Sequence, residues 1–230
     1  MAGDPATSER ETERTRGIAD IAAADGTPFV VAGTVFFLGS AVLTRSGQPG
    51  ASTPVPWLVS HALWTVATVA LAAGTVAVVR RSSGLGAGVA GYVAAGAFGL
   101  GVLHTLQWTT WVYVDVVAYQ QGAHEMLLEP LFHPFGTGHM LMYGVLVGGG
   151  VAATAWGLRR EAATHRAIDY AGIAVGAATV LAAAVALLTL APVRSPPSLA
   201  TIGLLAACYG WITVLGVALS RGRNERRGLG

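Results

Sequence analysis

Residues 57–81 read WLVSHALWTVATVALAAGTVAVVRR. The first 23 residues of this stretch carry no Asp, Glu, Lys or Arg, and Arg80 and Arg81 end it. At a rise of about 1.5 Å per residue, a helix of this length spans the roughly 30 Å hydrocarbon core of a bilayer. Paired arginines at the end of an apolar run are typical of a helix that stops at the membrane surface. The stretch therefore predicts a transmembrane helix.

Working outward from this helix, the sequence contains further apolar segments separated by polar or Gly- and Pro-rich connections. Together with the first stretch they predict an all-α fold, a polytopic membrane protein built as a bundle of six transmembrane helices. The segment before residues 57–79 is short for a membrane span, and the connection at residues 113–135 is the longest within the bundle. The five additional spans are expected at about residues 29–43, 85–112, 136–158, 168–191 and 199–219.

The composition agrees with a membrane environment. Hydrophobic residues make up 53% of the chain and charged residues only 11%, whereas a soluble domain carries roughly 25% charged residues. A soluble protein with so few charges would expose large apolar patches. We therefore expect the lipid bilayer to be the main partner and the cell (plasma) membrane to be the location of this multi-pass protein.

The arginines predict the orientation. If the N-terminal tail is cytoplasmic, six spans leave only Arg45 and Arg194 outside. Cationic loops resist translocation, so this distribution predicts that both chain ends are cytoplasmic, N-in and C-in. The twelve arginines on the predicted inner side are Arg10, Arg14, Arg16, Arg80, Arg81, Arg159, Arg160, Arg166, Arg221, Arg223, Arg226 and Arg227.

The same assignment divides the chain into three parts. Residues 1–27 are expected to form a cytoplasmic tail, because the polar start lacks the apolar run of a signal peptide. Within this tail, Ile18 to Ala24 are expected to form a short interfacial helix. Residues 28–220 form the transmembrane domain, and residues 221–230 a basic cytoplasmic tail.

Several function classes are disfavoured by what the sequence lacks. The chain contains no Lys, which excludes a lysine Schiff base, and its single Cys208 excludes an intrachain disulfide. No basic patch with interleaved aromatics is present, so no nucleic acid partner is expected. No charged residue falls in the middle of a predicted span, which disfavours an ion-coupled transporter or a channel.

Three histidines lie at a similar depth near the outer ends of their predicted helices. His61 is about one turn into the second span, His104 about two turns short of the end of the third, and His139 about one turn into the fourth. All three are expected within roughly 12 Å of the outer interface. A binding or catalytic site is therefore expected in the outer half of the bundle.

Each of these histidines has an aromatic residue one turn further along the same helix. Residues three or four apart share a helix face, and polar faces on apolar helices turn toward the bundle interior. If the faces converge, they form an aromatic-lined pocket with imidazoles at its rim. The pairs are His61 with Trp64, His104 with Trp108, and His139 with Tyr143.

Two cofactor chemistries suit such a pocket. Haem b takes axial imidazoles from facing helices at one depth, and three imidazoles can instead hold zinc or copper with one coordination position open. Further ligand candidates are Met142, which shares a face with His139, and His133, Glu125 and Glu129 in the outer connection. The two glutamates share a face if their segment is helical, and either can act as a second-shell partner or general base.

Two alternatives stay open at the level of sequence. Histidines near an interface also serve only in hydrogen bonds between helices, and tryptophans there anchor the protein at headgroup level. Small residues recur every fourth position, including Gly91, Ala95 and Gly99 and the pair Gly172 and Gly176. This spacing lets helices pack closely and is compatible with a non-catalytic subunit or scaffold that contacts a membrane-protein partner or a second copy. The function expected first is haem or metal binding at the outer leaflet, for electron transfer or metal handling.

Overall fold

A computed structural model gives the fold of most of the chain. Residues 1–25, which include the expected interfacial helix, lie outside the described residues, as do the short gaps between the ranges below. Side chains are described throughout these ranges except at residues 54, 85–87, 129–137 and 222–227. The structure describes residues 26–45, 54–80, 85–122, 129–161, 164–191 and 195–227.

The described residues form helices and connections, with no strand among them. Each of six helices is long and apolar enough to cross a membrane. The prediction of an all-α, six-helix membrane bundle is thereby confirmed. The helices are α2 (Thr27–Arg45), α3 (Pro54–Val79), α4 (Leu85–Gln120), α6 (Glu129–Glu161), α7 (Arg166–Leu188) and α8 (Pro196–Arg227).

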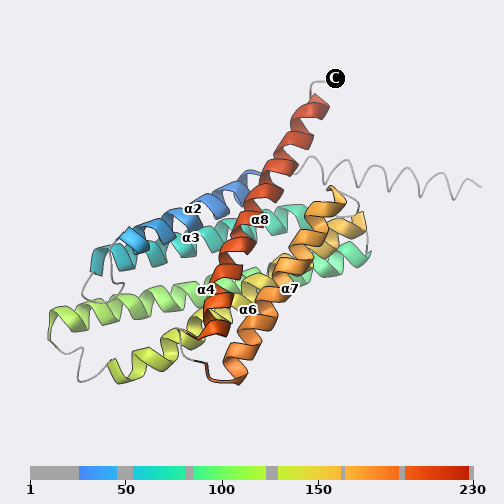
Figure 1. Ribbon diagram of the computed structural model, residues 1–230. Helices are drawn as coiled ribbons and strands as arrows, with labels where there is room; N and C mark the ends of the chain where they lie inside the picture. The colour runs from blue at the N-terminus through green and yellow to red at the C-terminus, as the bar shows by residue number, and fades with distance from the viewer. Residues whose placement is uncertain are drawn as a thin grey trace, which may run out of the picture.

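The six helices lie side by side in one bundle (Figure 1), and their contacts form a closed ring. Each helix packs against the next one along the chain, and α8 packs back against α2. Helix α6 also contacts α8 across the ring. In its apolar window 61% of the residues are buried, about twice the share in α3 or α4, so α6 is the central helix of the bundle.

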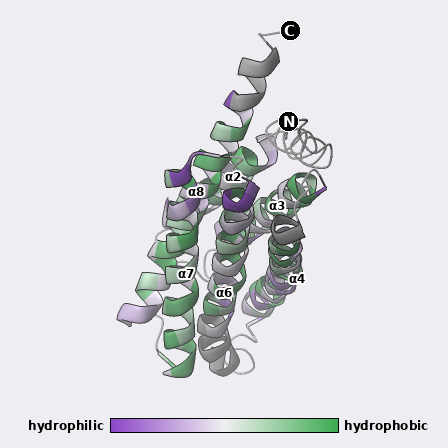
Figure 2. Ribbon diagram, turned by 90° about the vertical axis from the view of Figure 1, so that its right-hand side faces the viewer, coloured by the Kyte–Doolittle hydropathy of each residue, from purple (hydrophilic) through white to green (hydrophobic). Residues whose placement is uncertain are grey.

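The outward surfaces of the bundle are apolar. Tyr92 on α4 is 73% exposed and Leu188 on α7 is 85% exposed, and the hydrophobic colour runs along α7 in Figure 2. Such surfaces fit a lipid environment, because a protein that exposed so large an apolar area to water would aggregate. The chain is therefore a multi-pass membrane protein.

Close helix contacts in the core depend on glycine. An added Cβ on Gly176 of α7 would lie 2.6 Å from the carbonyl oxygen of Gly148 on α6, and one on Gly148 would lie 2.8 Å from the carbonyl oxygen of Gly176. The two backbones therefore touch at this pair, as the four-residue spacing of small residues predicted.

Several helices extend further than the apolar runs predicted, and α6, for example, begins at Glu129 instead of about residue 136. Helix α4 continues past Val112 to Gln120, and α8 continues past Leu219 to Arg227. The 36 residues of α4 extend about 54 Å, well beyond the roughly 30 Å hydrocarbon core. A helix needs apolar side chains only where lipid surrounds it, so the hydropathy pattern located the membrane crossing and missed the projecting turns.

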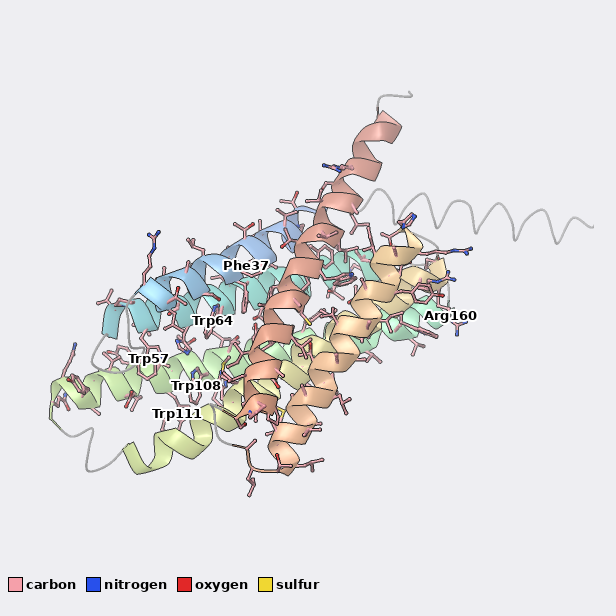
Figure 3. The ribbon with its side chains drawn as sticks, viewed as in Figure 1. Phe37, Trp57, Trp64, Trp108, Trp111 and Arg160 are labelled. Atoms are coloured by element: carbon pink, nitrogen blue, oxygen red, sulfur yellow. The ribbon has the colours of Figure 1, made fainter. Side chains whose placement is uncertain are left out.

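The arginines gather at one end of the bundle. The start of α2 and the end of α8 lie at this end (Figures 1 and 2), and it also carries Arg80, Arg159 and Arg160, the last of which is labelled in Figure 3. Arg45 lies at the opposite end, where α2 finishes. We call the first the arginine-rich end. That it faces the cytoplasm stays a prediction from the positive-inside rule.

Candidate functional site

The imidazoles of α4 and α6 meet directly. The His104 and His139 rings stack with their centroids 4.2 Å apart and their planes 21° from parallel. Trp108, one turn beyond His104 on α4, stacks on His139 at 4.1 Å and 10°. Because α4 and α6 run antiparallel as neighbours, side chains at one depth on the two helices face each other.

The third imidazole, on α3, joins this stack through tryptophan. His61 lies 6.4 Å from Trp108 between ring centroids, and it also contacts Trp57 at 5.8 Å and Trp64 at 5.0 Å. Figure 3 places the three tryptophans together, in the half of the bundle away from Arg160. We call the six side chains His61, His104, His139, Trp57, Trp64 and Trp108 the His–Trp cluster.

The cluster is shielded from the surroundings. His61 is 6% exposed and His139 is 8% exposed, and His104 and Trp108 are half-buried. The predicted convergence of the three histidine-bearing faces therefore occurs, although Trp108 rather than an imidazole bridges His61 to the other two.

Backbone carbonyls fix which ring nitrogen carries the hydrogen in two of the histidines. His61 Nδ1 lies 2.8 Å from the Trp57 carbonyl oxygen, and His104 Nε2 lies 3.1 Å from the His139 carbonyl oxygen. A carbonyl oxygen only accepts, so each of these nitrogens is the donor. In a neutral ring the opposite nitrogen, Nε2 of His61 or Nδ1 of His104, then keeps its lone pair.

A hydroxyl network lies deeper in the bundle, below the cluster. The Thr68 hydroxyl is 2.7 Å from the Tyr143 hydroxyl, which in turn hydrogen-bonds to the Tyr209 hydroxyl. All three residues are buried, and they link α3, α6 and α8. Tyr143 therefore lies on the inward face that the sequence predicted, but it takes part in this network rather than contacting His139.

Tyr209 of α8 was not foreseen from the sequence. Its ring stacks on Phe36 of α2 with centroids 3.8 Å apart and planes 4° from parallel, and Phe36 stacks on Trp64 at 5.9 Å. Tyr209 thereby connects the His–Trp cluster to α8. The available signal was its hydroxyl, one of three in an apolar span together with those of Thr201 and Thr213, since such groups seek partners inside a bundle.

Some side chains assigned to the histidine faces turn elsewhere. Met142, which the spacing placed beside His139, is 43% exposed, whereas Met140 packs on the hydrophobic core. Gln107 and Trp111 are also exposed, although their spacing of three and seven residues from His104 would place them on its helix face. Whether a side chain points into the bundle depends on which side of its helix packs against neighbouring helices. The spacing of residues along the sequence does not determine this.

The remaining ligand candidates lie where the structure gives no side-chain geometry. Glu125 falls outside the described residues, and Glu129 and His133 lie in the first turns of α6, where only the helix is described.

Asp115 is buried near the projecting end of α4, at 1% exposure. Within the part of the chain that is described, no three His, Cys, Asp or Glu side chains form a group able to hold a metal ion.

The chain matches no protein-family model, no curated protein and no solved structure. Arguments about its function therefore rest on its own residues.

Proposed function

We propose that this membrane protein binds a transition-metal ion in the His–Trp cluster, for metal handling or electron transfer at the outer leaflet. The observation that carries the proposal is the pair of carbonyl hydrogen bonds made by His61 and His104. Histidines that bind metals almost always donate their other ring N–H to such a partner, which orients the ring and raises its basicity.

The chemistry of the cluster suits a borderline metal. Imidazole nitrogens bind zinc, copper, iron and nickel, and the three histidines lie among tryptophans that exclude water from the rings. In the stacked arrangement, however, the two ring planes lie nearly parallel and about one ring thickness apart, with centroids 4.2 Å apart, and a nitrogen lone pair lies in the plane of its own ring, so His104 and His139 cannot both coordinate one ion. Binding therefore requires the His139 ring to turn out of its stack with Trp108.

The stack supports a single ion more than haem b. Two axial imidazoles lie on opposite faces of a haem, with the macrocycle between them. His104 and His139 instead stack on each other at 4.2 Å, so haem b on this pair would require the two helices to separate. A single ion requires only rotation of side chains.

The test is metal binding by the purified full-length chain in detergent. Chelator-stripped protein is titrated with Zn²⁺ and with copper(I), and bound metal is counted by mass spectrometry of the elements. Since binding turns His139 away from Trp108, tryptophan fluorescence should change in step with metal uptake. A visible spectrum of the protein as purified tests haem b directly.

The variants separate the cluster from other histidines. His139→Gln should abolish uptake, and His61→Gln should weaken it. The matched control is His165→Asn, at the start of α7, where the side chain accepts a hydrogen bond from Ala167 N and asparagine caps a helix equally well. Absence of a stoichiometric metal ion in the wild-type protein after titration would refute the proposal, and a Soret band would show haem b in its place.

A second candidate function is a non-catalytic subunit that contacts a second copy through α4. Added Cβ atoms on Gly96 and Gly99 would meet nothing within 4 Å, so two small positions on this helix lie outside the bundle's own packing. Gly91 differs, because a Cβ there would collide with Val79 of α3. Under this proposal Gly99→Leu lowers the oligomeric state in detergent, whereas an unchanged state removes α4 as the contact.

A further inference from the structure

Two arginines at the arginine-rich end lie on aromatic rings. The Arg159 guanidinium carbon lies 5.4 Å from the ring centroid of Tyr170, and that of Arg160 lies 4.9 Å from the ring of Trp156. Trp156, Arg159 and Arg160 belong to the end of α6, and Tyr170 belongs to the first turns of α7. We call these four residues the Arg–aromatic corner.

Stacking leaves the polar edge of each guanidinium available. A guanidinium is planar and presents its N–H groups in its own plane, so a ring beneath it takes none of them. The Nε atom of Arg159 is in addition buried, with no hydrogen-bond acceptor among the described residues. Because this atom has almost no accessible surface, the N–H groups that can reach a bound anion are those of the two terminal nitrogens of Arg159.

The aromatic rings present an apolar surface next to these charges. Tyr170 is 57% exposed and Trp156 is 47% exposed, at helix ends where aromatic side chains meet the boundary between headgroups and acyl chains. The corner therefore combines two phosphate-binding groups with rings that contact lipid chains. A free anion in water would use only the first of these features.

The other charges around the corner leave it cationic. His165 and Arg166 are exposed at the start of α7. Glu161 closes α6, and Asp169 is fully buried, with one carboxylate oxygen accepting from the Thr164 hydroxyl. Asp169 attracts Arg159 toward the bundle, but its burial keeps it from facing a ligand at the surface.

We propose that the Arg–aromatic corner binds the phosphodiester headgroup of an anionic phospholipid in the leaflet at the arginine-rich end. The two guanidinium edges bind the phosphate oxygens, and the Trp156 and Tyr170 rings pack on the upper acyl chains. The site is separate from the His–Trp cluster, which lies in the opposite half of the bundle, and does not depend on metal binding.

The test is native mass spectrometry of the full-length chain with phosphatidylglycerol and with phosphatidylcholine of the same acyl chains. A charge-assisted hydrogen bond from a guanidinium to a phosphate oxygen contributes about tenfold in affinity, so Arg159→Gln with Arg160→Gln should weaken phosphatidylglycerol binding about 100-fold. The charge-matched control is Arg80→Gln with Arg221→Gln, which removes two exposed arginines from the same end and should leave this binding unchanged.

Lysine variants distinguish the stacked site from general charge attraction. Arg159→Lys with Arg160→Lys keeps both charges but loses the planar fork of the guanidinium, so it should weaken phosphatidylglycerol binding. Because the charges are kept, this variant should fold as the wild type does, and its weaker binding then does not come from unfolding. The proposal is overturned if the lysine variant binds as the wild type does, if both glutamine pairs weaken binding equally, if phosphatidylcholine binds as tightly, or if millimolar inorganic phosphate displaces the lipid.

Discussion

Replacing Gly176 by alanine places one methyl group where α6 and α7 touch. The new Cβ would lie 2.6 Å from the Gly148 carbonyl oxygen and 2.7 Å from the Ala152 backbone nitrogen. Both are backbone atoms, so the helices have to move apart. Because backbone atoms cannot rotate aside, this overpacking falls in the upper part of the range for crowded cores, about 2–3 kcal/mol, and the better helix propensity of alanine recovers about 1 kcal/mol. The expected net loss in the free energy of unfolding is about 1–2 kcal/mol.

The matched control is the same substitution at Gly203 on α8, where an added Cβ meets nothing within 4 Å. There only the propensity remains, and alanine should stabilise by up to about 1 kcal/mol. One kcal/mol shifts Tm by about 2–4 °C in a protein of this size. Gly176→Ala should therefore lower Tm by about 2–8 °C and Gly203→Ala should raise it by about 2–4 °C.

The assay is thermal unfolding in detergent, followed by circular dichroism at one fixed scan rate, because membrane proteins often unfold irreversibly. The comparison between the two variants matters more than either value. If Gly176→Ala is as stable as the wild type, or if both alanines shift Tm in the same direction, the close approach of α6 and α7 is wrong.

Two further predictions concern the hydroxyl network and the orientation. Thr68→Val removes the hydrogen bond to Tyr143 and should cost about 0.6 kcal/mol, the average for such bonds between membrane helices. Combining it with Tyr143→Phe should cost less than the sum of the single losses, and strict additivity in thermal unfolding would show that the two hydroxyls do not interact. Cys208 is the only cysteine and is buried, so a membrane-impermeant thiol reagent should not modify the wild type in intact cells. The reagent should modify Arg45→Cys and leave Arg160→Cys unmodified, and the reverse pattern would place the arginine-rich end outside.

The fold was largely predictable because each crossing is an apolar run and most runs end at arginine. The stop at Arg80, for example, coincides with the end of α3 at Val79. The projecting turns of α4 beyond Val112 were not predictable from hydropathy, because a helix outside the lipid keeps its backbone hydrogen bonds without apolar side chains.

The depth of the candidate site in the membrane could be predicted from the sequence, whereas the contacts between its side chains could not. The rise per residue placed His104 and His139 at one level, and their rings stack. That Trp108 would stand between His61 and His139 depends on how far α4 is rotated about its own axis, which neighbouring helices decide. The same limit applies to Met142, whose spacing matched His139 but whose side chain is 43% exposed.

The most direct test of the proposed metal site is X-ray absorption spectroscopy of the metal-loaded chain. The proposed site requires imidazole scattering around the ion, with metal–nitrogen distances of about 2.0–2.1 Å for zinc, and this scattering should disappear together with metal uptake in His139→Gln. A spectrum with oxygen ligands alone, or one that His139→Gln leaves unchanged, would contradict it.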